Sequence, residues 1–166
     1  SAPEGRLVIC CEDVAGRRYV TFEDNGAGLS ADEAREFLAT IGRGQTGRAL
    51  HDATADGADN LIGRFGVGLL AAFMVADRVE VESRRFDLGP EQGVRWVNEG
   101  QQTYRIEAWS RRDAGTSVRL RMRETMAHMG TEVAVRGALD RWARYLDVPM
   151  QFASGAVLRA GVLPWR

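Results

Sequence analysis

An apolar stretch, Leu69–Val75, follows directly on the glycine-rich sequence Gly63-Arg64-Phe65-Gly66-Val67-Gly68. A helix that is apolar on nearly every side has no polar face for water, so we expect this one to be buried. The longest apolar run, Val67–Ala76, is far shorter than the roughly 20 residues that a membrane-spanning helix needs. The rest of the chain must therefore provide a globular domain that covers the helix.

Alternating apolar and charged residues predict β-strands on both sides of this helix. Arg6–Glu12 and Arg18–Asp24 read as an antiparallel hairpin. The same alternation predicts four later strands, at Val79–Arg84, Val94–Val97, Tyr104–Trp109 and Val118–Met122. Helices do not separate the strands regularly, so we expect an α+β fold: a two-layer sandwich whose mixed, mostly antiparallel sheet is covered on one face by helices.

Two further helices are predicted from their caps and their apolar spacing. Ser30 and Glu33 have the spacing of a capping box, and Ala34, Phe37, Leu38 and Ile41 follow at helical intervals. Thr131 is a candidate cap for a second helix, which ends before Pro149 and has an apolar stripe of Val135, Leu139, Trp142 and Leu146.

The segment Gly42–Asn60 has little apolar periodicity. A loop of this length without a function is unusual, and we assign residues 42–62 to a mobile lid.

Charge and composition exclude several functions. The chain has 22 basic and 23 acidic residues with a net charge of −1, which gives no general attraction to nucleic acids or anionic lipids. Every basic residue is arginine, which excludes a P-loop lysine. Cys10 and Cys11 are adjacent in a predicted strand and point to opposite faces, while His51 and His128 lack partners at zinc-ligand spacing. We expect no metal site built from protein ligands, no membrane segment and a cytoplasmic location.

Three motifs can carry chemistry, and each also has an ordinary structural interpretation. Asp24–Gly28 places a carboxylate at a strand end before two glycines, although Asn-Gly after a strand also favours a hairpin turn. Gly63–Gly68 can present backbone N–H groups to a phosphate, or can simply allow a tight turn. Gly115–Val118 places a hydroxyl at a strand start, which is common at turns. Their order and spacing together are much harder to reach by chance.

Taken together, these motifs resemble the N-terminal nucleotide-binding domain of the heat-shock protein 90 chaperones, a family with the Bergerat-type ATP-binding fold. Asp24–Leu29 resembles the Asp-x-Gly-x-Gly adenine motif of the family, and Leu38–Ile41 resembles the helix after it. The most specific stretch runs from Leu61 through the Phe-Gly-Val-Gly sequence to Val79. Gyrase, histidine-kinase and MutL ATPases share the Asp-x-Gly-x-Gly turn, whereas Phe-Gly-Val-Gly with Ala-Asp-Arg-Val is similar to the chaperones.

The resemblance implies an ATP/ADP site with Mg²⁺. Asp24 would accept a hydrogen bond from the adenine amino group, with Gly28 and Thr116 completing the polar contacts to the base. Arg43 stands where the family has a lid lysine. The remaining implied residues fall into apolar walls and a phosphate-binding helix start: Leu29, Leu38, Leu69 and Val118 for the walls, and Gly66, Val67 and Gly68 for the phosphates.

The sequence also departs from the family pattern. In the family, a helix before the first hairpin carries the glutamate that activates water and the asparagine that binds Mg²⁺, and neither has a counterpart ahead of Ser1. We therefore expect residues 1–166 to be a domain truncated at its start, with no catalytic residue of its own, although the parent protein would be an ATPase. Phe37, Gly44-Gln45 and Leu69 replace a polar residue, a Ser-Gly pair and an aromatic residue.

The leading hypothesis is an ATP/ADP-binding domain of an Hsp90-like chaperone that acts in the stress response. The resemblance implies client proteins and a homodimer as partners, with no nucleic acid and no membrane. One alternative is a regulatory or scaffold module of the same fold that does not hydrolyse nucleotide. Another is the ATPase domain of a DNA-repair or topoisomerase relative, against which the balanced charge argues.

Overall fold

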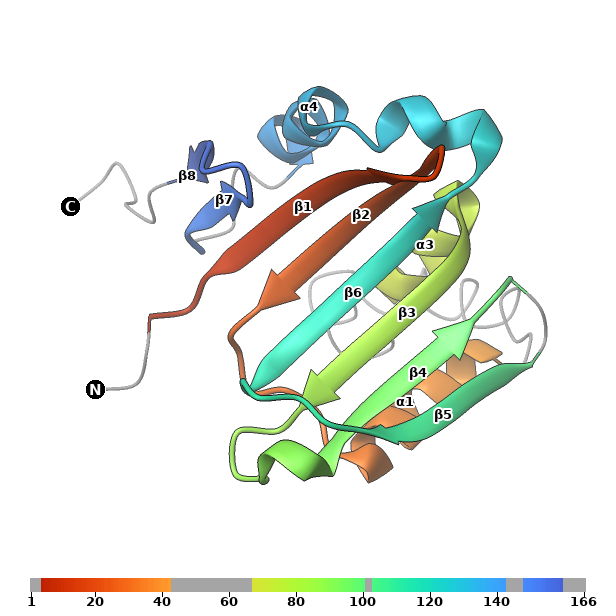
Figure 1. Cartoon of the computed structure of the whole chain (residues 1–166), viewed down its shortest axis with the longest axis vertical. Coiled ribbons are helices and arrows are strands. Elements are labelled where there is room, and N and C mark those ends of the chain that lie inside the picture. Colours follow the sequence, from red (N-terminus) through yellow and green to blue (C-terminus); the bar gives the residue numbers. More distant parts are fainter. Residues whose placement is uncertain (1–3, 43–66, 101–102, 143–147, 160–166) are drawn as a thin grey trace, which may run out of the picture.

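The computed structural model describes residues 4–42, 67–100, 103–142 and 148–159, and one eight-stranded sheet organises them (Figure 1). The strand order is β5-β4-β3-β6-β2-β1-β7-β8, and every pair of neighbours is antiparallel except β1 and β7. This confirms the mixed, mostly antiparallel sheet. The strands are β1 (Leu7–Val14), β2 (Arg17–Asp24), β3 (Ala76–Arg84), β4 (Gly93–Asn98), β5 (Tyr104–Trp109), β6 (Gly115–Met122), β7 (Met150–Phe152) and β8 (Val157–Arg159).

The predicted antiparallel hairpin is present, and a two-residue turn joins β1 and β2. Ala15 and Gly16 have φ angles of 51° and 77°, which is the positive φ at both central positions of a type I′ hairpin turn. The Gly16 N–H donates to Asp13 Oδ1 at 3.0 Å. The register follows directly from this turn, and it places Ile9 opposite Phe22 and Cys11 opposite Val20.

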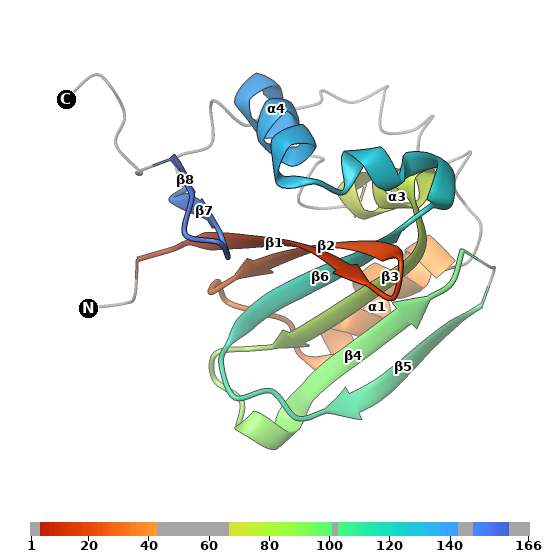
Figure 2. The same cartoon turned by 45° about the horizontal axis from the view of Figure 1, so that its top comes forward.

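The helices cover one face of the sheet, which we call the covered face. α1 (Ala31–Gly42) packs on β4 and β5, and α3 (Val67–Val75) packs against β3. α4 (Glu132–Trp142) adds Val135 and Leu139 to the same core. Figure 1 shows α1 and α3 behind the strands, and in the turned view of Figure 2 α1 still lies behind β3 and β4. The fully buried centre of this core consists of Ile9, Val79, Trp96 and Phe152.

The predicted caps of α1 and α4 are both present. The Ser30 N–H donates to Glu33 Oε2 at 2.7 Å, and the Glu33 N–H donates to Ser30 Oγ at 3.3 Å, which completes a capping box. Thr131 Oγ1 accepts the Ala134 N–H at 3.2 Å. Leu146, at the end of the predicted stripe, lies outside the described residues.

One expectation about burial is wrong. In α3, Met74 is 75% exposed, so this helix is not buried on nearly every side. In α1, Phe37 is 40% exposed, while Ala34 and Leu38 are buried. In a two-layer fold, a helix rests on the sheet along one side only, and its other side turns away from the strands.

Two short strands and two 3-10 helices were not predicted. β7 and β8 have three residues each, too few for an alternating pattern, and β7 pairs in parallel with the distant β1. The 3-10 helices are η2 (Pro90–Gln92) and η3 (Glu124–Met129). Among the described helices, none is long and apolar enough to cross a membrane.

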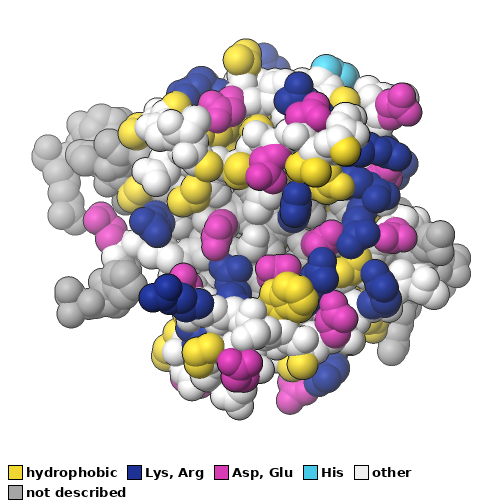
Figure 3. Space-filling view, in the orientation of Figure 1, with side chains coloured by type: hydrophobic (Ala, Val, Ile, Leu, Met, Phe, Trp, Pro, Cys, Tyr) yellow, Lys and Arg dark blue, Asp and Glu magenta, His cyan; other side chains and the backbone are white. Residues whose placement is uncertain are grey.

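The opposite face of the sheet, which we call the open face, carries alternating arginine and glutamate side chains (Figure 3). The Glu80 carboxylate forms ion pairs with the guanidinium groups of Arg78 and Arg95, each with an N–O distance of 2.7 Å. The Arg95 guanidinium also lies 4.6 Å from the centre of the Trp109 ring. Burial alone would raise the pKa of Glu80, but hydrogen bonds and charge from Arg95 and Arg78 hold that pKa below its ordinary value.

Candidate functional site

Three polar residues lie side by side across β2, β6 and β3 at one end of the covered face. Asp24 is paired with Thr116, and Thr116 is paired with Ser83. We call these three residues the polar row. On the same face, the positions two and four residues away from the polar row are apolar in all three strands. They are Phe22 and Val20 in β2, Val118 and Leu120 in β6, and Val81 and Val79 in β3. The polar row therefore lies at the end of a stretch of apolar residues on this face of the three strands.

The Asp24 carboxylate, at the end of β2, is half-buried and has one oxygen occupied. Its Oδ1 accepts the Gly26 N–H at 2.8 Å, and Oδ2 accepts no hydrogen bond from the residues that the structure describes. Asn25 anchors the turn to the segment before β1. Its Oδ1 accepts the Arg6 N–H at 2.7 Å, and its Nδ2 donates to the Glu4 carbonyl at 3.0 Å. Asp24 thus caps the turn, but the chain continues into α1 rather than returning as a hairpin.

Two glycines bring backbone segments into direct contact beside the polar row. Gly28 has a φ of +67°, and a Cβ there would collide with the backbone of Arg84. Gly115 has a φ of +116°, and a Cβ there would collide with the Asp24 carbonyl. Both positions therefore require glycine for conformation and for space.

Arg84 fixes the loops next to these glycines. Arg84 is 9% exposed, and its guanidinium donates to the carbonyls of Leu88 and of Arg112, the latter at 3.0 Å. Guanidinium donors are well suited to hold two loops at once, because five N–H groups project from one plane. The end of β3 is thereby held in place under the turn that contains Gly28.

The structure brings together four of the residues that the sequence singled out: Asp24, Gly28, Leu29 and Thr116. The Leu29 N–H donates at 2.8 Å to Ser83 Oγ, which in turn lies 2.8 Å from Thr116 Oγ1.

Of the other predicted residues, some lie near this end of the sheet or in the core, and some are not described by the structure. Val118 occupies the next inward position on β6, and Leu38 of α1 is buried in the core at 5% exposure. Val67, Gly68 and Leu69 lie in the first turn of α3, where the backbone is described. Arg43, Gly66 and the lid residues 43–62 lie outside the described residues.

Sequence reasoning missed Ser83. The signal for it was present: in β3, Val79 and Val81 are the inward positions, and the period of two makes Ser83 the next one. A serine at an inward position needs buried hydrogen-bond partners, and that requirement marks it as different from the glutamates beside it.

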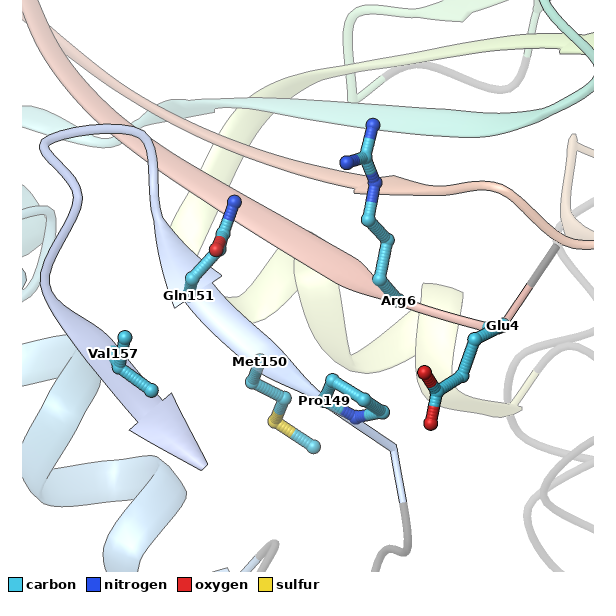
Figure 4. Close-up of a pocket in the computed structure, with 7 residues that line it drawn as sticks. Glu4, Arg6, Pro149, Met150, Gln151 and Val157 are labelled. Carbon is cyan, nitrogen blue, oxygen red and sulfur yellow. The ribbon is translucent and has the colours of Figure 1, made fainter. Parts of the chain in front are cut away.

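Two cavities lie away from the polar row. One, of about 330 Å³, borders the starts of β1 and β7; Pro149, Met150 and Val157 supply apolar surface, and Glu4 and Arg6 point to different sides (Figure 4). The other, of about 610 Å³, lies between the first turn of α1 and strands β4 and β5. Neither is lined by a residue of the polar row. Across the described part of the chain, no three His, Cys, Asp or Glu side chains gather as a metal site.

Comparison with known proteins identifies the family. Residues 5–126 match the family described as histidine kinase-, DNA gyrase B-, and HSP90-like ATPase, which covers both the Asp24 turn and the strand with Thr116. The chain belongs to this ATPase family. The match confirms the α+β ATPase fold that the motifs indicated.

Named relatives of this ATPase domain are chaperones. Chaperone protein HtpG of Alkalilimnicola ehrlichii is 37% identical over 92% of this chain and 24% of the relative. The HtpG protein of Cupriavidus necator is 37% identical over 87% of this chain and 23% of its own length. That of Shewanella amazonensis is 32% identical over 89% of this chain and 24% of its own length. The chain thus spans about a quarter of the curated relatives it matches, and within that span it is similar to an Hsp90-type ATP-binding domain.

The polar row fits the base of a nucleotide in chemical terms. A carboxylate is an acceptor for an exocyclic amino group, and a neighbouring hydroxyl can donate or accept. Glycine at position 28 lets the turn pack directly against the Arg84 backbone beside that carboxylate. The carboxylate and the hydroxyl of the polar row can therefore form hydrogen bonds with a base that carries an exocyclic amino group.

Proposed function

We propose that this chain binds ATP and ADP as part of an Hsp90-like chaperone, and that the nucleotide cycle of the parent protein drives work on client proteins. The observation that carries the proposal is the polar row, because it places Asp24 and Thr116 next to each other at the end of the covered face. The similarity to HtpG chaperones supports the chaperone part of the proposal.

In the proposed site, Asp24 accepts the adenine amino group, and the Gly28 backbone and the Thr116 hydroxyl complete the polar contacts. Leu29, Leu38, Leu69 and Val118 enclose the base, and the backbone around Gly66, Val67 and Gly68 holds the phosphates at the start of α3. Arg43 contributes from the lid. The bound nucleotide supplies a phosphoanhydride bond, and Mg²⁺ accompanies it.

Other parts of the proposal concern the parent protein. We place it in the cytoplasm, as a homodimer that acts in the stress response. Its partners are adenine nucleotides and client proteins, with no role for nucleic acids or membranes. A balanced charge of −1 supports the exclusion of nucleic acids, because phosphate backbones are bound mainly through a positive surface.

Asp24→Asn tests the proposal by calorimetric titration of ADP with Mg²⁺. Asparagine keeps Oδ1 as acceptor for the Gly26 N–H, so the turn is preserved while the negative charge is lost. We expect a loss of about 1.5 to 3 kcal/mol of binding free energy, which is the usual contribution of a hydrogen bond to a charged group.

The matched control is Asp32→Asn, because Asp32 is an exposed carboxylate in α1 that pairs only with Arg35 among the described residues. This variant should bind ADP like the unmodified chain. If the unmodified chain fails to bind ADP, or if Asp24→Asn binds it with unchanged affinity, the proposal is wrong.

A further inference from the structure

Ser83 is the second-last residue of β3, and its side chain points to the covered face. It is fully buried, with 0% of its surface exposed. Its hydroxyl meets three groups from two other segments of the chain. It accepts the Leu29 N–H at 2.8 Å, lies 2.8 Å from Thr116 Oγ1, and lies 3.1 Å from the Gly115 carbonyl oxygen. Ser83 thus connects the turn that follows Gly28 to the first two residues of β6.

The hydrogen-bonding capacity of a hydroxyl limits how this cluster can be arranged. Serine has one proton to donate and two lone pairs that accept. The Leu29 N–H uses one lone pair, so the single proton goes either to the Gly115 carbonyl or to Thr116 Oγ1. When it goes to Gly115, the Thr116 hydroxyl must donate to Ser83, and its own lone pairs then point away from Ser83. In both arrangements, Ser83 determines which way the Thr116 hydroxyl faces.

The position of Thr116 makes this orientation relevant to a ligand. Thr116 is the middle residue of the polar row, paired with Asp24 on one side and with Ser83 on the other. Asp24 and Leu29 flank the same end of the sheet. A single buried hydroxyl therefore holds a side chain and a backbone group that both belong to the proposed base site.

We propose that Ser83 is a positioning residue of the nucleotide site, which fixes the Thr116 hydroxyl and the Leu29 backbone without touching the base. This inference rests on the proposed function. It assigns to β3 a part in base recognition, although the sequence motifs lie only on the segments around Asp24, Gly66 and Thr116.

Ser83→Ala, Thr116→Val and the double variant test this role by titration with ADP and with adenosine. Each single variant should weaken ADP binding about tenfold, the loss expected for one net hydrogen bond. The double variant should lose less affinity than the product of the two single losses, because part of the effect of Ser83 runs through Thr116. Ser83→Ala should reduce adenosine and ADP binding by the same factor, since the change lies at the base and not at the phosphates.

Ser117→Ala is the matched control, because Ser117 is the next residue of β6 and points to the open face. It should bind ADP like the unmodified chain. Ser83 has no positioning role if Ser83→Ala binds ADP normally, if the two losses multiply to about a hundredfold, or if ADP loses more affinity than adenosine. Such results leave the proposed function intact as long as the unmodified chain binds ADP and Asp24→Asn weakens it. Absence of ADP binding to the unmodified chain removes both proposals.

Discussion

The covered and open faces of the sheet are built from the same strands, yet they treat polar groups in opposite ways. On the covered face, polar side chains are few, and in the polar row Ser83 is fully buried and has specific partners. On the open face, charges are many, and one arginine is shared among several carboxylates: Arg95 reaches Glu80, Glu82 and Glu107. Each contact there is partly solvated and replaceable.

The difference shows which face of such a sheet can hold polar groups in the fixed geometry that specific ligand recognition needs. A buried hydroxyl without partners is costly, so its partners must stay in place, and the geometry becomes fixed. Exposed ion pairs contribute about 0 to 1 kcal/mol each and tolerate rearrangement. A site that must recognise one base is therefore expected on the covered face. The following predictions compare matched residues on the two faces.

Two tryptophans on neighbouring strands should differ most. Trp96 is fully buried on the covered face between Phe73 and Tyr104, while Trp109 is partly exposed on the open face under Arg95. Trp96→Ala should lower the free energy of unfolding by about 3 to 5 kcal/mol. Trp109→Ala should lower it by about 1 kcal/mol, mainly through the lost cation–π contact. Urea unfolding measures both, and equal losses would show that the two faces are equally packed.

Gly115→Ala should have the next largest effect, about 2 kcal/mol of stability. The new Cβ would collide with the Asp24 carbonyl, so β2 and β6 would have to separate at the polar row. Gly137→Ala in α4 is the control: it meets no atom within 4 Å, and alanine favours helix by up to about 1 kcal/mol. The unfolding midpoint should therefore fall for Gly115→Ala and rise for Gly137→Ala. A Gly115→Ala protein as stable as the unmodified chain would contradict the close contact between Gly115 and the Asp24 carbonyl.

Glu80 should make open-face stability depend on acid pH. Because its folded pKa is lower than its unfolded pKa, ionised Glu80 stabilises the fold above the ordinary value of about 4.3, and this contribution is lost as the pH falls through the folded pKa. Glu80→Gln should cost about 1 kcal/mol at neutral pH and flatten the decline in stability in acid. Glu107→Gln, which removes a more exposed partner of Arg95, is the comparison variant. Identical profiles for all three proteins would rule out this role for Glu80.

The two adjacent cysteines give the smallest contrast. Burial raises the pKa of both thiols, with Glu12 adding to the effect at Cys10 and Glu132 at Cys11. Both should react with iodoacetamide more slowly than free cysteine at neutral pH, because less thiolate is present. Cys10 lies on the open face and should be modified before Cys11. Mass spectrometry of Cys10→Ser and Cys11→Ser proteins measures the two rates, and faster reaction of Cys11 would contradict the assignment of faces.

Local patterns predicted the elements that depend on neighbouring residues. The hairpin, the capping box at Ser30 and the cap at Thr131 all follow from interactions across a few positions. Asp24 and Thr116 were also predicted, although their adjacency depends on β2 pairing with β6. Ser83 was missed because its function depends on two pairings at once, and β7 was missed because its partner β1 lies at the other end of the chain.

The position of β6 in the sheet has a consequence for synthesis on the ribosome. β6 lies between β2 and β3, but it is made after β1 through β5. A nascent chain that stops before Gly115 can form the β1–β2 hairpin and the β3–β4–β5 meander, yet no strand joins them into one sheet. Because such distant pairings form late, the polar row cannot assemble until β6 has emerged. Ribosome-bound chains shorter than this leave the edges of β2 and β3 unpaired and are the species that need protection from aggregation.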